Sequence, residues 1–130
     1  MQKNKIYKEG YMTEQKPTGL TRIIKAYGYS RAGIKSAWKN EAAFRQECFA
    51  LAVLSPPAFF LGRNRMERAV LISSLLIVVV TELLNSAIEA VVDRIGPGYH
   101  PLSGRAKDMG SAAVLMSIVL AAMVWALILI

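Results

Sequence analysis

The sequence predicts an all-α membrane protein with an N-terminal amphipathic surface helix and three transmembrane helices. Three observations predict this fold class. Hydrophobic residues make up 54% of the 130-residue chain, the apolar residues form three long runs, and basic residues gather before the first run. A soluble chain of this length has too little interior to hide so much apolar surface, so lipid or partner subunits must cover it. The length predicts a single domain over residues 18–130.

The N-terminal part of the chain is polar and then amphipathic. Residues 1–17 lack periodicity and are predicted to be a disordered tail, within which Met12 is an alternative start. Residues 20–40 are predicted to form a helix that lies in the membrane interface, or alternatively packs on other protein. Its apolar residues follow helical spacing: Leu20, Ile23, Ile24, Tyr27, Ile34, Ala37 and Trp38.

Three apolar runs follow the surface helix. The predicted spans are residues 42–62, 69–92 and 110–130. The second span is about 36 Å long at 1.5 Å per residue, enough to cross a bilayer core. The first is interrupted by Pro56-Pro57, which is expected to end or kink a helix because proline lacks the N–H that a helix uses. Residues 93–109 are predicted to be a polar connection rich in glycine and proline.

The charge distribution predicts the topology. The net charge is +7, and residues 1–45 hold ten Lys/Arg but only three acids. A basic flank beside apolar spans favours a cytoplasmic N-terminus, and three spans then place the 93–109 loop on the cytoplasmic side too. Nucleic-acid binding is the rival interpretation of a basic chain, and it is disfavoured because half of the chain is too apolar to lie in water. One cysteine, Cys48, and one histidine, His100, are too few for a disulfide framework or a Cys/His zinc site.

An acidic stripe inside the second span is the most informative feature of the sequence. At 100° per residue, Glu82, Asn85, Ser86, Glu89 and Asp93 lie within about 60° of one line. A carboxylate at bilayer depth costs several kcal/mol, and this span contains no basic residue. The stripe must therefore face a polar crevice, a metal or another helix. Divalent metal is the natural counter-charge, since magnesium prefers one or two carboxylates with water and phosphate oxygens.

The depth of the acids indicates the kind of reaction. Glu89 and Asp93 are expected near the cytoplasmic end, whereas Glu82 lies seven residues, about 10 Å, deeper. A deep, desolvated carboxylate suits a general base that takes a proton from a lipid hydroxyl. Lys107, with Arg22 and Arg105, could neutralise nucleotide phosphates. The alternatives are a structural polar network, or a cation or proton pathway built on the same stripe.

Four segments resemble the small prokaryotic diacylglycerol kinase family. They read TRIIKA at 21–26, NEAAFRQE at 40–47, ELLNSAIEAVVDRIG at 82–96 and LSGRAKDMGSAAV at 102–114. The resemblance implies a homotrimeric bundle in the bacterial inner membrane, with active sites between protomers at the cytoplasmic surface. It implies transfer of the ATP γ-phosphate to diacylglycerol with Mg²⁺, giving phosphatidic acid. A close branch of the family phosphorylates undecaprenol instead, and the match at 40–47 favours diacylglycerol.

The same resemblance assigns expected roles to individual residues. It implies Glu82 as the general base and Glu41 and Glu89 as the metal ligands. Glu41 and Arg45, four residues apart, could instead simply pair. The residues implied around the nucleotide and its metal are Arg22, Tyr29, Glu41, Asn85, Glu89, Asp93, His100, Lys107 and Asp108. The residues implied on the lipid side are Arg22, Ser30, Trp38, Arg45, Glu47, Glu82 and Ser111. The sequence departs from the family pattern at Tyr27, Arg31, Pro97, Gly98 and Pro101.

Overall fold

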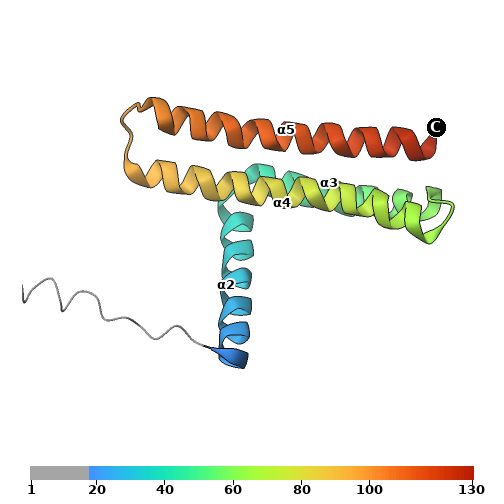
Figure 1. Ribbon diagram of the computed structural model, residues 1–130, viewed down its shortest axis with the longest axis horizontal. Coiled ribbons are helices and arrows are strands. Elements are labelled where there is room, and N and C mark those ends of the chain that lie inside the picture. The colour runs from blue at the N-terminus through green and yellow to red at the C-terminus, as the bar shows by residue number, and fades with distance from the viewer. Residues whose placement is uncertain (1–17) are drawn as a thin grey trace, which may run out of the picture. The chain divides into compact units, whose positions relative to one another are not determined.

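The computed structural model describes residues 18–130, which form four helices and no strand (Figure 1). The helices are α2 (Gly19–Asn40), α3 (Ala42–Leu61), α4 (Arg65–Ile95) and α5 (Pro101–Leu129). The all-α prediction is therefore confirmed for this part of the chain. The predicted tail, residues 1–17, lies outside the described residues. The described residues divide into two compact units, one that ends at Lys35 and the other Ser36–Ile130.

A helix forms over the segment predicted for the surface helix, and its place in the membrane interface stays a prediction. Helix α2 begins at Gly19, whose φ of 61° is a backbone conformation that glycine adopts readily, and it continues through Gly28 and Gly33. Ser30 donates a hydrogen bond from Oγ to the carbonyl oxygen of Ala26 at 3.0 Å, so its hydroxyl is satisfied within the helix. Leu20 is 72% exposed, as expected of an apolar face that something outside the chain must cover.

Of the two effects expected of Pro56-Pro57, an end of helix α3 does not occur, and a kink stays a prediction. The helix runs through both prolines to Leu61. Proline already has a φ close to the helical value, and its missing N–H costs hydrogen bonds without forcing the helix to end. The Ser55 hydroxyl just before the prolines bonds the Leu51 carbonyl oxygen at 2.6 Å.

Helix α4 is longer than the predicted second span because its start is capped. Asn64 Oδ1 accepts a hydrogen bond from the Glu67 N–H at 2.9 Å, and Glu67 Oε2 accepts one from the Arg63 N–H at 2.7 Å. This reciprocal arrangement satisfies N–H groups that would otherwise lack partners at a helix start. The helix then runs to Ile95 and ends at Gly96, whose φ is 136°.

Most of the predicted 93–109 connection is helical, and its bounds as the polar segment between two spans stay a prediction. Residues 93–95 continue α4, and α5 begins at Pro101, so only residues 96–100 lie outside the helices. His100 caps α5, since its Nδ1 accepts a hydrogen bond from the Leu102 N–H at 3.2 Å. Proline is well suited to the first helical turn, where its missing N–H has no intrahelical partner to lose.

Helix α4 packs against both α3 and α5, and α5 runs beside it (Figure 1). Its buried apolar face includes Leu71, Leu75 and Val78. On α5 the buried residues are small, namely Gly110, Ser117 and Ala121. Small residues let two helices approach closely.

Two helices, α4 and α5, are long and apolar enough to cross a membrane. The outer side of α5 carries large apolar residues such as Met116, which is 72% exposed, and Leu127, which is 80% exposed. An exposed apolar surface of this kind indicates contact with lipid or another protein. That α3 forms a third span remains a prediction.

Candidate active site

The acidic stripe occupies the C-terminal half of α4, and its exposure rises towards the end of the helix. Glu82 is only 6% exposed, and Asn85 and Ser86 are also buried. Glu89 is half-buried, whereas the Asp93 side chain is 67% exposed. The three buried residues share the face that the helical spacing predicted. The stripe therefore runs from a desolvated carboxylate to one in contact with solvent.

Asn85 links the stripe to α5. Its Nδ2 donates a hydrogen bond to Glu89 Oε1 at 3.1 Å. On its other side the Asn85 amide lies against Gly110, where a Cβ would collide with Asn85 Oδ1. The absence of a side chain at Gly110 therefore allows Asn85 to hold Glu89. The sequence reasoning missed Gly110, although it begins the row of small residues that continues at Ser117.

Three other carboxylates lie near Glu82. Glu47, Glu89 and Glu41 each repel the Glu82 carboxylate electrostatically, Glu47 most strongly. Glu41 stands at the junction before α3, and Glu47 lies in the second turn of that helix. Within Ser36–Ile130 none of these four carboxylates forms an ion pair with a lysine or arginine. The four carboxylates therefore form a cluster of negative charge that no lysine or arginine of Ser36–Ile130 neutralises.

Asp93 and Lys107 form an ion pair across the α4–α5 connection. Lys107 Nζ lies 2.6 Å from Asp93 Oδ1. Lys107 precedes the apolar stretch 110–130, and the hydrogen bond to Asp93 raises the pKa of its ammonium group. Because both side chains are substantially exposed, water screens the pair and it contributes little to stability. The ion pair holds the Lys107 ammonium group at the solvent-exposed end of the acidic stripe.

Arg45 connects α2 to α3. Its Nη1 donates to the carbonyl oxygens of Trp38 at 2.8 Å and Lys39 at 3.4 Å, groups that lack helical partners at the end of α2. The alternative pairing of Arg45 with Glu41 is not formed. The first of these hydrogen bonds brings together Trp38 and Arg45, two of the residues implied on the lipid side. Trp38 is 54% exposed.

The other predicted site residues fall into two groups. Arg22, Tyr29 and Ser30 lie on the exposed surface of α2 in the first unit. Asp108 and Ser111 are exposed in the first half of α5, where His100 serves as the cap.

No group of three or more His, Cys, Asp or Glu side chains in residues 18–130 is placed to hold a metal by itself. Magnesium often binds through one or two carboxylates while phosphate oxygens and water complete its shell. Glu41 and Glu89, which form no ion pair within residues 18–130, fit that smaller contribution. The donor set suits a cation that arrives with a nucleotide.

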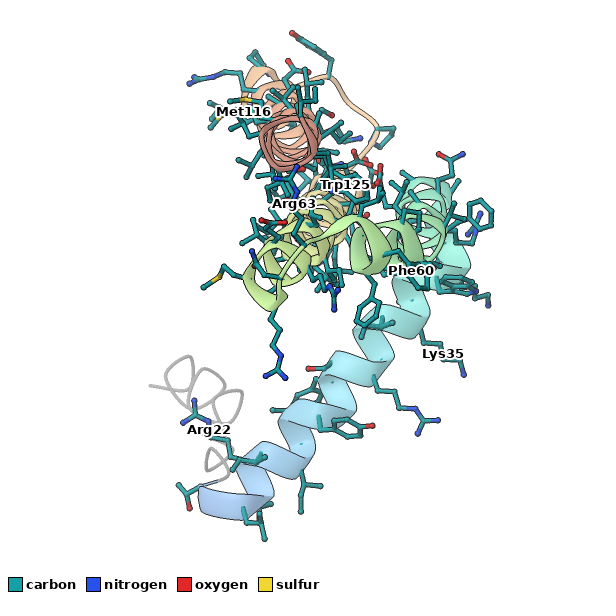
Figure 2. The ribbon with its side chains drawn as sticks, turned by 90° about the vertical axis from the view of Figure 1, so that its right-hand side faces the viewer. Arg22, Lys35, Phe60, Arg63, Met116 and Trp125 are labelled. Atoms are coloured by element: carbon teal, nitrogen blue, oxygen red, sulfur yellow. The ribbon has the colours of Figure 1, made fainter. Side chains whose placement is uncertain are left out.

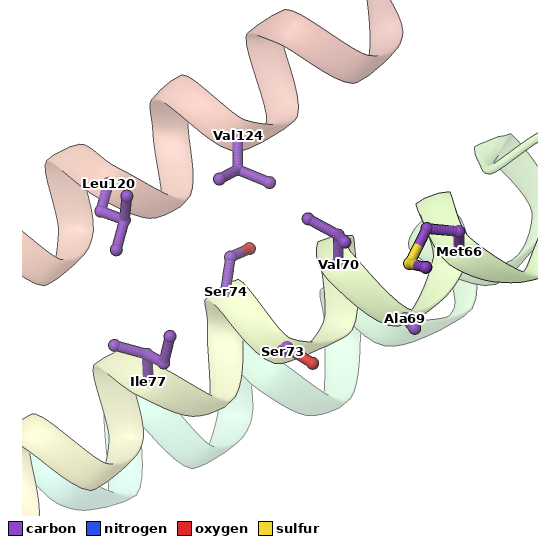
Figure 3. Close-up of a pocket in the computed structure, with 8 residues that line it drawn as sticks. All are labelled: Met66, Ala69, Val70, Ser73, Ser74, Ile77, Leu120 and Val124. Carbon is purple, nitrogen blue, oxygen red and sulfur yellow. The ribbon is translucent and has the colours of Figure 1, made fainter.

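Two grooves lie between α4 and α5. The one beside the stripe has a volume of about 500 Å³ and is almost entirely apolar. It is lined by Thr81, Leu84, Asn85, Ile88, Ala106, Met109, Gly110 and Ala113. The second has a volume of about 350 Å³ and lies nearer the start of α4 (Figure 3). It is lined by Met66, Ala69, Val70, Ser73, Ser74, Ile77, Leu120 and Val124. Of these two grooves, the first is the one lined by Asn85, which is hydrogen-bonded to Glu89.

The sequence of this chain is similar to a family of known proteins. The family model described as prokaryotic diacylglycerol kinase matches residues 28–129. The diacylglycerol kinase of Escherichia coli K12 is 58% identical over 112 residues, covering 86% of this chain and 92% of that protein. The Haemophilus influenzae diacylglycerol kinase is 54% identical over 110 residues, covering 85% and 93%. The Pseudomonas aeruginosa diacylglycerol kinase is 52% identical over 112 residues, covering 86% and 91%.

Proposed function

The chain belongs to the prokaryotic diacylglycerol kinase family, and on that premise we propose that it phosphorylates diacylglycerol with ATP. The γ-phosphoryl group moves to the free hydroxyl of the lipid, and the products are phosphatidic acid and ADP. The observation that carries the proposal is the buried Glu82 at the inner end of a carboxylate row that opens to solvent at Asp93. Such a row suits a reaction between a water-soluble phosphate donor and an alcohol held in lipid.

Glu82 acts as the general base. Its carboxylate takes the proton of the lipid hydroxyl while that oxygen forms a bond to the γ-phosphorus. The bond between this phosphorus and the bridging oxygen of ADP breaks, and the electron pair leaves with ADP. The position of Glu82 favours this role, because it is the buried carboxylate of the row, on the side away from the solvent-exposed Asp93.

Glu41 and Glu89 are the proposed ligands of Mg²⁺, which neutralises phosphate charge when bound. The Asn85 amide supports the metal role of Glu89, since its hydrogen bond fixes the orientation of the carboxylate. Lys107, held by Asp93, supplies a positive charge for the nucleotide phosphates. The other residues proposed around the nucleotide are Arg22, Tyr29, His100 and Asp108.

The lipid side is proposed to use Arg22, Ser30, Trp38, Arg45, Glu47 and Ser111. Exposed Trp38 suits the boundary between lipid tails and headgroups. The apolar groove beside Asn85 has the volume and the lining to receive part of an acyl chain. A lipid bound there would bring its polar end near the carboxylate row.

The proposed assembly is a homotrimer of three-span protomers in the bacterial inner membrane. The exposed apolar residues of α5 support a covering by lipid and partner protomers. The basic excess in residues 1–45 supports a cytoplasmic position for the N-terminus and for the turn at 96–100. The carboxylate row would then open towards cytoplasmic ATP.

A transfer assay tests the proposed function. The purified protein, in mixed micelles, receives ATP labelled at the γ-phosphate together with either diacylglycerol or undecaprenol. The proposal expects labelled phosphatidic acid and requires Mg²⁺. If undecaprenol is labelled in preference to diacylglycerol, then undecaprenol is the substrate. Cation or proton flux through vesicles without lipid phosphorylation would support the pathway alternative.

A further inference from the structure

The turn between α3 and α4 gathers three arginines that the proposed kinase reaction does not use. Arg63 and Arg65 are exposed and Arg68 is half-buried. The single acid among them, Glu67, is already engaged by the Arg63 N–H and by Asn64 Nδ2 at 3.0 Å. Within Ser36–Ile130 none of the three guanidinium groups forms an ion pair. The turn therefore presents a surplus of positive charge.

Arg68 is held in a defined position. Its Nε donates a hydrogen bond to the Gly62 carbonyl oxygen at 3.0 Å, and its Cζ lies 4.8 Å from the centre of the Phe59 ring. A Cβ at Gly62 would come within 2.6 Å of Arg68 Cγ, so glycine makes room for this arrangement. These contacts leave the terminal nitrogens available. A guanidinium ordered in advance loses less conformational entropy when it binds an oxyanion.

Apolar side chains adjoin the arginines at the end of α3. Phe59 is 53% exposed, Phe60 is 81% exposed and Leu61 is 53% exposed. The Phe60 ring stands edge-on to the Phe59 ring, with centres 5.9 Å apart. Figure 2 views the second unit from this end and labels Phe60 and Arg63. Exposed aromatic rings beside arginines match the chemistry of a phospholipid, whose tails and charged head are joined at one boundary.

The turn lies far from the carboxylate row along the same helix. Arg65 and Asp93 are separated by 28 residues of α4, which corresponds to about 42 Å. A bilayer with its headgroup layers is about 40–45 Å thick. If α4 crosses the bilayer, the two ends lie in opposite headgroup layers.

We propose that the α3–α4 turn binds the phosphate of an anionic phospholipid in the leaflet opposite the carboxylate row. Arg63, Arg65 and Arg68 contact the phosphate oxygens, and Phe59 and Phe60 pack against the upper part of the acyl chains. Arginine suits this ligand because its planar fork can donate two parallel hydrogen bonds to a phosphate. The proposal does not depend on the kinase reaction.

The test uses the full-length protein in nanodiscs of phosphatidylcholine, to which phosphatidylglycerol is added in steps. Native mass spectrometry counts the retained anionic lipids. The variant Arg63→Gln/Arg65→Gln leaves the Arg68 contacts intact and is expected to weaken retention on the order of tenfold. The matched control Arg31→Gln/Lys35→Gln removes the same charge from exposed positions on α2 and is expected to retain lipid within about twofold of the parent protein.

Two results would overturn the proposal. One is equal loss of phosphatidylglycerol in the turn variant and the control, since retention would then follow net charge alone. The other is displacement of phosphatidylglycerol by millimolar inorganic phosphate, since the turn would then bind a free anion. A thermal scan of both variants in phosphatidylcholine alone checks that the turn variant is folded. Retention of lipid that is insensitive to phosphate and lost only in the turn variant supports the lipid site.

Discussion

The two ends of helix α4 handle charge in opposite ways. At its start, Glu67 accepts hydrogen bonds from a backbone N–H and an amide, and Arg68 is stacked on an aromatic ring. In its C-terminal half, Glu82 is buried with three other carboxylates nearby and, within Ser36–Ile130, no ion pair to any of them. The first arrangement stabilises the fold. The second has a cost in stability, and a cost of this kind is expected where a site needs a particular charge for its chemistry.

The largest expected effect is that of Glu82→Gln. This substitution keeps the size of the side chain but removes the general base, so the turnover number should fall at least about 10²-fold. The melting temperature should stay unchanged or rise, because a buried carboxylate without a counter-charge is replaced by a neutral amide. Labelled phosphate transfer and a thermal scan measure the two quantities. Near-normal turnover would contradict the proposed role of Glu82.

The matched substitution at the other end of the helix is Glu67→Ala. It removes the acceptor for the Arg63 N–H and should lower the free energy of unfolding by about 1 kcal/mol. Turnover of the folded protein should remain within about twofold of the parent value, because Glu67 is remote from the carboxylate row. If Glu67→Ala lowered turnover without lowering the free energy of unfolding, Glu67 would serve the reaction rather than the fold. The two ends of α4 would then not differ as described.

Gly110→Ala should produce an intermediate effect. The added methyl group would displace the Asn85 amide and so disturb the hydrogen bond to Glu89. We expect turnover to fall on the order of tenfold, the lower limit for groups that orient a metal ligand. Gly104→Ala is the control on the same helix, since nothing lies within 4 Å of its added Cβ.

A double-mutant cycle separates this effect from general damage to the packing of α4 and α5. In an Asn85→Ala background the added methyl group has no amide to displace, so Gly110→Ala should cause little further loss of turnover. Equal losses in the two backgrounds would show that Gly110 does not act through Asn85.

Lys107→Gln should have a smaller effect, confined to the nucleotide. The variant loses the ammonium group that Asp93 holds beside the carboxylate row. We expect the KM for ATP to rise several-fold with little change in the KM for diacylglycerol, because an exposed positive charge assists phosphate binding without forming part of the lipid site. A change in the lipid KM alone would contradict this assignment.

The smallest effect is expected for Phe59→Leu at the end of α3, where the ring lies under Arg68 of α4. The leucine keeps apolar contact but removes the aromatic face under Arg68. The free energy of unfolding should fall by about 0.5–1 kcal/mol, the range for a partly exposed cation–π pair. Chemical denaturation in micelles measures this loss, and turnover should not change.

The sequence predicted the parts of the fold that follow helical periodicity and hydrophobic length. The helix at 20–40, the apolar runs and the common face of Glu82, Asn85 and Ser86 were all readable because each depends on residues three or four positions apart. The sequence does not indicate that α3 continues through Pro56-Pro57, or that residues 93–95 and 101–109 of the polar connection are helical. Proline tolerance inside α3 and the early start of α5 depend on geometry that composition does not contain.

The contacts within the site were less predictable than its residue types. Acids in an apolar span attract notice in any sequence, since they are costly in lipid. Pairing across helices, such as Lys107 with Asp93 or Gly110 with Asn85, depends on how α4 and α5 are aligned. The hydrogen bond from Arg45 to the end of α2 could not be predicted either. Arg45 and Glu41 are four residues apart, a spacing that equally suits an ion pair on one helix.

The most direct test of the account concerns the cation that the carboxylates are proposed to share with a nucleotide. Mn²⁺ can replace Mg²⁺ as a paramagnetic probe, and its resonance reports binding to the protein in the presence of a non-hydrolysable ATP analogue. The account predicts that the parent protein holds the Mn²⁺–nucleotide complex on the order of tenfold more tightly than Glu41→Gln/Glu89→Gln. Equal binding by the parent protein and this variant, with both proteins folded, would contradict the claim that the acids of α4 are kept in an apolar helix to bind a phosphate-bearing cation.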